Sequence, residues 1–210
     1  MGGEFNTIKP CRVGLLGGTF NPLHLGHLVM AQDAMERYDL DEVCLIPCAS
    51  PPHKQGHKIA PGRHRLAMIE AVLEEDCRLS CSVIELERGG VSYTIDTVLE
   101  LKKRYPQTEF YFIIGGDTLF ELYTWKKIDK LLQVCLFITV ARPRFDFEEI
   151  NMGTLRLSEQ QVEMLRSHVM VGHQVDISST VIRARIAEGL SIRYLVPEKI
   201  VMYIAEHNLY

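Results

Sequence analysis

Two nearly unbroken apolar segments constrain the fold of this chain most strongly. Residues 110–114 read FYFII and residues 136–140 read LFITV, so each holds a continuous run of hydrophobic side chains. A strand needs such a run when helices cover both of its faces, because neither face then meets water. These two segments therefore predict buried strands of a parallel sheet.

Other apolar segments alternate with segments of helical period. Residues 12–16, 43–46 and 82–86 are also predicted strands, and the intervening helices are predicted at 28–37, 63–74, 95–104 and 126–132. This alternation predicts an α/β fold, a doubly wound Rossmann-like parallel sheet. In such a sheet the ligand crevice lies beyond the carboxyl ends of the strands, so polar motifs at those ends are the first candidates for a site.

The pattern changes after residue 142. There we predict helices at 158–167, 179–188 and 197–207, the last with Pro197 in its first turn, and a short strand near Val175. A chain of 210 residues can bury one sizeable core but hardly two. We expect one domain over residues 10–210, with a Rossmann-like core at 10–145 and a small C-terminal helical subdomain at 146–210. Residues 1–9 are an expected tail or an added remnant, and residues 49–62 a polar loop long enough to move.

Charge and hydropathy narrow the range of partners. The 23 basic and 27 acidic residues are interspersed and give a net charge of -4, whereas duplex nucleic acid requires a basic stripe. No apolar run reaches the roughly 20 residues that span a bilayer, and no secretory leader is visible. We expect a soluble cytoplasmic protein that binds neither nucleic acid nor membrane. The sequence leaves the oligomeric state open, a homo-oligomer included.

The six cysteines raise the question of zinc or disulfides. Cys44 and Cys48, like Cys77 and Cys81, are spaced four apart, which is not the usual spacing of a zinc site. We therefore expect reduced, partly buried thiols.

The most informative motif is GGTFNPLHLGH at residues 17–27, directly after the first predicted strand. Gly17 and Gly18 let the backbone pass close to a ligand, Thr19 adds a hydroxyl, and the start of the following helix offers amide donors to an anion. The motif is neither a Walker loop nor a dinucleotide fingerprint. It therefore predicts a phosphate site of another kind.

His24 and His27 are three residues apart and can point to the same side of the first helical turn. There they can donate hydrogen bonds to phosphate oxygens, or carry positive charge that offsets charge on a phosphorus centre under attack. A histidine at a helix start can equally be a cap or a solvated side chain. The whole motif resembles the signature of the HxGH nucleotidyltransferase superfamily. Asn21 stands where many relatives carry Asp, and we interpret it as a turn residue that hydrogen-bonds its own backbone.

Two further segments lie at expected sheet ends or helix starts. ISSTVIRARI at residues 177–186 resembles the segment that grips the triphosphate of ATP in this superfamily, which implicates Ser179, Thr180 and Arg183. Ser178 or Ser179 can also be an ordinary helix N-cap. Gly115, Gly116 and Asp117 follow the fourth predicted strand. From position alone, Asp117 can bind a ribose hydroxyl or cap the next helix.

Three shorter motifs narrow the resemblance: PPHK at 51–54, SYTIDT at 92–97 and TW at 124–125. With the first motif, they make the chain similar to the bacterial nicotinate mononucleotide adenylyltransferases. This resemblance implies that the pyridine ring stacks on Trp125 and that its carboxylate lies near Thr94 and the backbone of Lys126. The alternative for Trp125 is that it only packs a helix, and the alternative for Lys54 is a solvated side chain.

The resemblance implies a full set of site residues. The implied catalytic residues are His24, His27 and Arg183. The implied ATP-binding residues are Gly17, Gly18, Thr19, Phe20, His24, His27, Gly115, Asp117, Arg142, Ser179, Thr180 and Arg183. The implied mononucleotide-binding residues are Thr19, Lys54, Tyr93, Thr94, Asp117, Trp125 and Lys126.

The implied reaction transfers AMP from ATP to nicotinate mononucleotide by direct in-line displacement, without a covalent enzyme intermediate. We expect Mg²⁺ to be held through phosphates and water, with no metal ligand from the protein. Two alternatives are an adenylyltransferase acting on phosphopantetheine and a nucleotide-binding sensor without turnover. Residue chemistry alone leaves the choice between nicotinate and nicotinamide mononucleotide open.

Overall fold

The computed structural model describes residues 11–51, 59–141, 146–173 and 175–210. Its centre is a six-stranded sheet in the order β3-β2-β1-β4-β5-β6, in which every neighbouring pair is parallel. The strands are β1 (Arg12–Gly18), β2 (Glu42–Pro47), β3 (Leu79–Cys81), β4 (Glu109–Gly115), β5 (Leu136–Ala141) and β6 (Val169–Val171). The predicted parallel sheet is confirmed. The strand order reverses between β1 and β4, which places the crevice of a doubly wound fold there.

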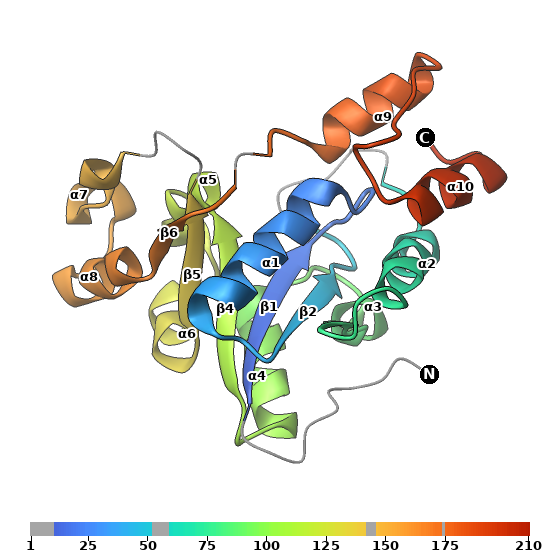
Figure 1. Ribbon diagram of the computed structural model, residues 1–210. Helices are drawn as coiled ribbons and strands as arrows, with labels where there is room; N and C mark the ends of the chain where they lie inside the picture. Colours follow the sequence, from blue (N-terminus) through green and yellow to red (C-terminus); the bar gives the residue numbers. More distant parts are fainter. Residues whose placement is uncertain (1–10, 52–58, 142–145, 174) are drawn as a thin grey trace.

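Helices cover both faces of this sheet (Figure 1). They are α1 (Leu25–Tyr38), α2 (Gly62–Leu73), α3 (Ile84–Arg88), α4 (Thr94–Arg104), α5 (Gly116–Leu119), α6 (Ile128–Val134), α7 (Met152–Leu155), α8 (Glu159–Ser167), α9 (Ser179–Ala187) and α10 (Glu198–Glu206), with 3₁₀ turns η1 (Leu122–Thr124) and η2 (Phe147–Glu149). In Figure 1 α1 crosses in front of the sheet, and α10 lies beside α2. The predicted helices are all present, with ends that differ from the prediction by at most three residues.

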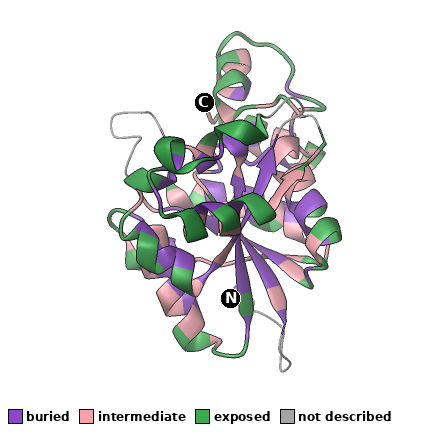
Figure 2. Cartoon of the chain, turned by 90° about the vertical axis from the view of Figure 1, so that its left-hand side faces the viewer, coloured by how far each residue is buried: buried purple, intermediate pink, exposed green. Residues whose placement is uncertain are grey.

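The sheet divides the interior into two apolar clusters. Val13 and Leu15 of β1 face a cluster that includes α3, α4, α6 and α8, whereas Leu16 faces a second cluster with α1, α2 and α10. Figure 2 shows buried residues concentrated along the strands and exposed residues on the outer sides of the helices. Burial on both faces is the reason why β4 and β5 have nearly continuous hydrophobic sequences.

The predicted strand at 82–86 is wrong. The strand of this region is β3, which ends at Cys81, and residues 84–88 form the short helix α3. The alternation of Ile84, Glu85 and Leu86 is typical of a strand, yet Ile84 and Glu85 are both buried. The backbone N–H of Glu87 donates to the carbonyl of Val83 at 2.9 Å, and that of Gly89 donates to the carbonyl of Glu85 at 3.0 Å, which is the four-residue hydrogen-bond pattern of a helix. The carboxylate of Glu85 is tolerated inside because Thr97 donates a hydrogen bond to it.

The predicted strand near Val175 is also wrong in its position. The strand forms at β6 and pairs with β5. The C-terminal part is therefore not purely helical, because it contributes β6, one of the two edge strands of the sheet. Pro197 is the N-cap of α10 rather than part of its first turn.

Two further properties concern the surface and the thiols. Within the described ranges, no helix combines the length and apolar character that crossing a bilayer would require. All six cysteines lie in the described ranges as thiols outside any disulfide, and four of them are buried: Cys11, Cys44, Cys48 and Cys135. Burial raises the pKa of Cys81 and of Cys135 to about 12, so these thiols are protonated and unreactive at neutral pH.

Candidate active site

The first motif forms the link between β1 and α1. β1 ends at Gly18 and α1 begins at Leu25, with His24 as its N-cap. The imidazole rings of His24 and His27 stack, with 3.7 Å between their centroids and 27° between their planes. The prediction that the two side chains lie on the same side of the helix start is confirmed.

The two histidines differ in their polar contacts. The backbone N–H of His24 donates to Nδ1 of His27 at 3.3 Å, so a neutral His27 ring carries its proton on Nε2. Nδ1 of His24 is buried, and it has no hydrogen-bond partner among the described residues. Burial lowers the pKa of His24 to about 4, so its ring is neutral at pH 7. Of the two roles predicted for His24, a hydrogen-bonding ring agrees with this structure better than a permanent cation.

Small residues and one phenylalanine fix the position of the rings. A Cβ on Gly26 would lie 3.1 Å from Nδ1 of His24, so glycine leaves room for that ring. Phe20 is only 1% exposed, and its ring packs edge-on against His27 with 5.1 Å between centroids. A Cβ on Gly18 would lie 3.0 Å from the ring of Phe20. The side chain of Phe20, predicted as an ATP contact, therefore supports His27 from the core and lines neither cavity described below.

Helix α9 reaches the first motif from the far end of the sequence. Ser178 is its N-cap and accepts a hydrogen bond from Val181 N–H at 3.3 Å, whereas Ser179 donates from Oγ to the carbonyl of Pro22 at 2.9 Å. The capping alternative therefore holds for Ser178 and not for Ser179.

The guanidinium of Arg183 lies between the first motif and its own helix. Nη1 donates to the carbonyl of Asn21 at 2.9 Å, and Nη2 donates to Oγ1 of Thr180 at 3.2 Å. Residues that are more than 150 positions apart in the sequence are thus joined in one site.

The first cavity, of about 620 Å³, lies between these two helix starts. Eight predicted ATP-site residues line it: Thr19, His24, His27, Gly115, Asp117, Ser179, Thr180 and Arg183. The N-cap of α5 is Gly115, so Asp117 is not the cap of that helix. The structure thus leaves the Asp117 carboxylate among the polar groups at the cavity wall.

The second cavity, of about 820 Å³, lies on the other side of the carboxyl end of β1. Nine predicted site residues line it: Gly17, Gly18, Thr19, His27, Tyr93, Thr94, Gly115, Trp125 and Lys126. Gly17 and Gly18 were predicted for ATP, but they line this cavity and not the first. The Trp125 ring packs edge-on against Phe112, with 5.7 Å between centroids, and also lines the cavity, so packing and ligand contact are compatible roles.

The two cavities meet. Five residues line both of them: Thr19, His27, Met30, Gly115 and Thr118. The junction therefore lies at the ends of β1 and β4, where the strand order reverses. Two ligands bound in the two cavities would face each other beside His27.

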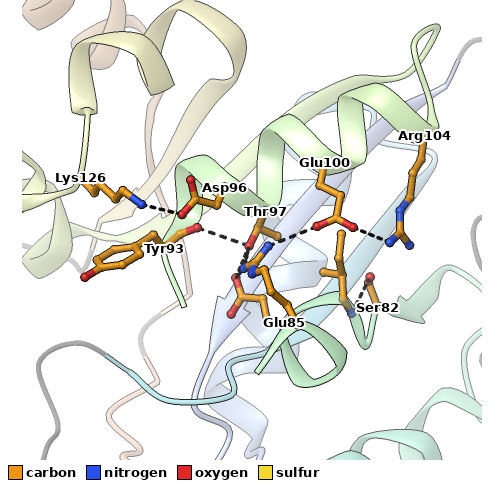
Figure 3. Close-up of polar contacts among 10 residues, drawn as sticks. Ser82, Glu85, Tyr93, Asp96, Thr97, Glu100, Arg104 and Lys126 are labelled. Carbon is orange, nitrogen blue, oxygen red and sulfur yellow. Dashed lines mark hydrogen bonds and ion pairs between the residues drawn. The ribbon is translucent and has the colours of Figure 1, made fainter. Parts of the chain in front are cut away.

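Polar contacts around the second cavity come from α3, α4 and the segment before α6 (Figure 3). Nζ of Lys126 donates to Asp96 at 2.8 Å and lies 4.3 Å from the centre of the Tyr93 ring. Thr97 donates from Oγ1 to Glu85 at 2.6 Å. Glu85 lines the cavity, yet sequence reasoning placed it on a strand and missed it.

Other site residues also escaped prediction. Asp33 of α1 and His173 line the first cavity and form a close pair, with 2.6 Å between Oδ1 and Nδ1. The hydrogen bond that the His173 ring donates to the Asp33 carboxylate raises the pKa of His173. Asp33 lies within a helical segment and His173 outside any motif, so no sequence signal joined them. The predicted site residues Lys54 and Arg142 lie outside the described part of the chain.

The fold and the paired cavities define a Rossmann-like nucleotidyltransferase. The model of the cytidylyltransferase-like family matches residues 15–185. A protein of Halalkalibacterium halodurans named "probable nicotinate-nucleotide adenylyltransferase" is 46% identical over 95% of this chain and 91% of its own length. One of Desulfitobacterium hafniense with the same name is 40% identical, with 96% of each chain covered.

Solved structures agree in fold. The Plasmodium falciparum nicotinic acid mononucleotide adenylyltransferase complexed with APC superposes with a TM-score of 0.74 at 18% identity, covering 95% of this chain and 97% of that one. The chain belongs to the cytidylyltransferase-like family and, within it, to the nicotinate-nucleotide adenylyltransferases.

Proposed function

We propose that the protein transfers AMP from ATP to nicotinate mononucleotide, forming nicotinate adenine dinucleotide and pyrophosphate in NAD biosynthesis. The observation that carries this proposal is the meeting of two cavities at Thr19 and His27. One is lined by hydroxyls, imidazoles and a guanidinium, which suit a triphosphate. The other has an aromatic wall, which suits a flat heteroaromatic ring.

The proposed reaction is a direct displacement at the α-phosphorus of ATP. A phosphate oxygen of the mononucleotide forms a new P–O bond, and the bond to pyrophosphate breaks with its electron pair leaving on pyrophosphate. Catalysis then consists of alignment and charge stabilisation. His27 lies at the junction and donates to the α-phosphate, while Arg183 and the start of α9 bind the departing phosphates.

Mg²⁺ dependence is part of the proposal. Among residues that the structure describes, no three His, Cys, Asp or Glu side chains form a metal-binding group. Both oxygens of Asp33 accept hydrogen bonds from His173. The site fits an ion held by phosphate oxygens and water, which Mg²⁺ prefers, while the chain binds the phosphates. When bound, the ion neutralises phosphate charge. A cytoplasmic location also belongs to the proposal, because free thiols suit a reducing compartment.

Nicotinate rather than nicotinamide is the proposed acceptor base. Helix α4 begins at Thr94, and its N-cap Tyr93 makes no side-chain capping hydrogen bond. The first amides of this helix, with their positive dipole end, therefore favour a carboxylate over a neutral amide. Lys126 adds a cation to the same cavity.

The test is pyrophosphate release with ATP and Mg²⁺, comparing nicotinate mononucleotide, nicotinamide mononucleotide and phosphopantetheine. We expect strong preference for the acid and loss of turnover by orders of magnitude in His27→Ala, with the exposed His207→Ala as control. Equal use of the amide would overturn the carboxylate assignment. Binding of ATP without turnover on any acceptor would identify a nucleotide sensor instead.

A further inference from the structure

The segment between β1 and α1 carries His24 and is held by groups from distant parts of the chain. Arg65 of α2, which is 2% exposed, donates from Nη1 to the carbonyl of Thr19 at 2.8 Å and from Nε to the carbonyl of Ala60 at 3.0 Å. The backbone N–H of Leu25 donates to the carbonyl of Leu195 at 3.0 Å. The histidine pair is therefore positioned by contacts outside its own motif.

Asn21 is the centre of these contacts. Its side chain is buried, and its Oδ1 accepts two hydrogen bonds, from Ala60 N–H at 3.0 Å and from the Tyr210 hydroxyl at 2.8 Å. Its backbone carbonyl accepts the hydrogen bond from Nη1 of Arg183. The orientation of Asn21 thus sets the position of the Arg183 guanidinium and of the backbone that leads to His24.

Tyr210 lies 189 positions from Asn21 in the sequence and packs against the same apolar cluster as Phe20 and Leu23. Burial raises the pKa of its hydroxyl, while the charges of Arg183 and Arg65 act weakly in the opposite direction. The hydroxyl therefore keeps its proton at every working pH and remains a hydrogen-bond donor to Asn21.

We propose that Tyr210 is a positioning residue of the transfer reaction, acting through Asn21 on Arg183 and on the segment that carries His24. The inference rests on the proposed function, because it gives Tyr210 a positioning role in that reaction. Tyr210 itself lines neither cavity. A small displacement of a catalytic group lowers the rate much more than it lowers stability, so loss of one hydroxyl is expected to appear mainly in kcat.

The first test compares Tyr210→Phe with Tyr203→Phe. Tyr203 of α10 also has a hydroxyl with one long-range partner, Nδ1 of His64 at 3.0 Å, but His64 lines neither cavity, whereas Asn21 lines the first. We expect Tyr210→Phe to lower kcat roughly tenfold with the KM for the mononucleotide within about twofold, and Tyr203→Phe to leave both unchanged. Stoichiometric binding of a non-hydrolysable ATP analogue shows the fraction of folded sites. Unchanged kcat per site in Tyr210→Phe would overturn the proposal.

The second test is a double-mutant cycle with Asn21. If Tyr210 acts through Asn21, Tyr210→Phe has less than about twofold effect on kcat in an Asn21→Leu background, because the acceptor is already absent. Asn21→Asp keeps an acceptor oxygen and is expected to retain the dependence on Tyr210. Multiplicative losses in the Asn21→Leu background would mean that Tyr210 acts by another route. Inactive wild-type protein would instead count against the proposed function, which separates the two failures.

Discussion

The rings of His24 and His27 stack at 3.7 Å, and the backbone N–H of His24 donates to Nδ1 of its partner. This arrangement sets the two histidines apart chemically. His24 is buried and neutral, whereas His27 lies where the two cavities meet. A neutral His24 ring beside His27 avoids the repulsion of two adjacent cations, and the two rings can present N–H donors to one phosphate.

The first prediction concerns the pH dependence of stability. The pKa of His24 is about 4 in the folded protein and about 6.5 when unfolded, so between these values the unfolded chain binds the extra proton. Stability is therefore lost as pH falls from about 6.5 to 4, by roughly 3 kcal/mol for this residue. Urea unfolding at pH 7 and pH 4.5 measures this loss, which is expected to be smaller in His24→Asn. The exposed His207→Asn serves as control, and equal pH dependence in both variants would contradict the assignment.

A second prediction separates the two cavities. Trp125 lines only the second one, so Trp125→Ala is expected to raise the KM for the mononucleotide by about tenfold or more, as loss of a ring-stacking partner does. The KM for ATP is expected to stay within about twofold. Trp125→Phe keeps a ring and should give an intermediate value. Because Trp125 also packs against Phe112 and Phe137, thermal unfolding of each variant checks that the fold is intact.

A third prediction concerns the buried carboxylate of Figure 3. Thr97 is 1% exposed and donates to Glu85 at 2.6 Å, while Arg88 lies 3.9 Å from the same carboxylate oxygen. Thr97→Val keeps the shape of the side chain but removes the hydroxyl that donates to Glu85. The buried carboxylate then lacks this hydrogen-bond donor, which is expected to lower the free energy of unfolding by about 1–3 kcal/mol.

The control for Thr97→Val is Thr154→Val, which removes an exposed hydroxyl bonded to Asn151. Its cost is expected to stay below about 0.5 kcal/mol. Urea unfolding at pH 7 measures both. Equal costs for the two variants would show that the Thr97 hydroxyl contributes no more than a surface hydroxyl.

The sequence predicted those features that local patterns encode. Continuous apolar runs identified β4 and β5, and the three-residue spacing of His24 and His27 placed both rings on one side of a helix start. The prediction failed where a tertiary contact decides the secondary structure. Glu85 gave residues 84–86 the apolar–polar alternation of a strand. Its burial depends on a hydrogen bond from Thr97 on another helix, which the local pattern does not contain.

Long-range contacts of single polar residues have no local pattern at all. Arg65 donates a hydrogen bond to Thr19, 46 positions away, and Tyr210 donates one to Asn21, 189 positions away. Neither Arg65 nor Tyr210 belongs to a motif. Asn21 was interpreted as a turn residue bonded to its own backbone, whereas its side-chain oxygen joins two distant segments. The roles of such residues can be recognised only from the folded structure.

The last prediction is that a substitution at Gly26, the second residue of α1, lowers activity without lowering stability. Alanine is the better helix former by up to about 1 kcal/mol, so Gly26→Ala is expected to leave the melting temperature unchanged or raise it. Its Cβ, however, would lie 3.1 Å from Nδ1 of His24, and the ring must shift by a few tenths of an ångström. Because that ring is stacked on His27, the shift reaches the cavity junction, and kcat is expected to fall at least about tenfold.

Gly153→Ala is the matched control, because Gly153 is the second residue of α7, with a Cβ position 3.3 Å from Oδ1 of Asn151 and remote from both cavities. Its kcat should equal that of the wild type. Calorimetry and steady-state kinetics on the two variants give the answer. Normal turnover in Gly26→Ala would mean that the reaction tolerates a displaced His24 ring, and catalysis would then depend on His27 and Arg183 without a fixed position for their neighbour.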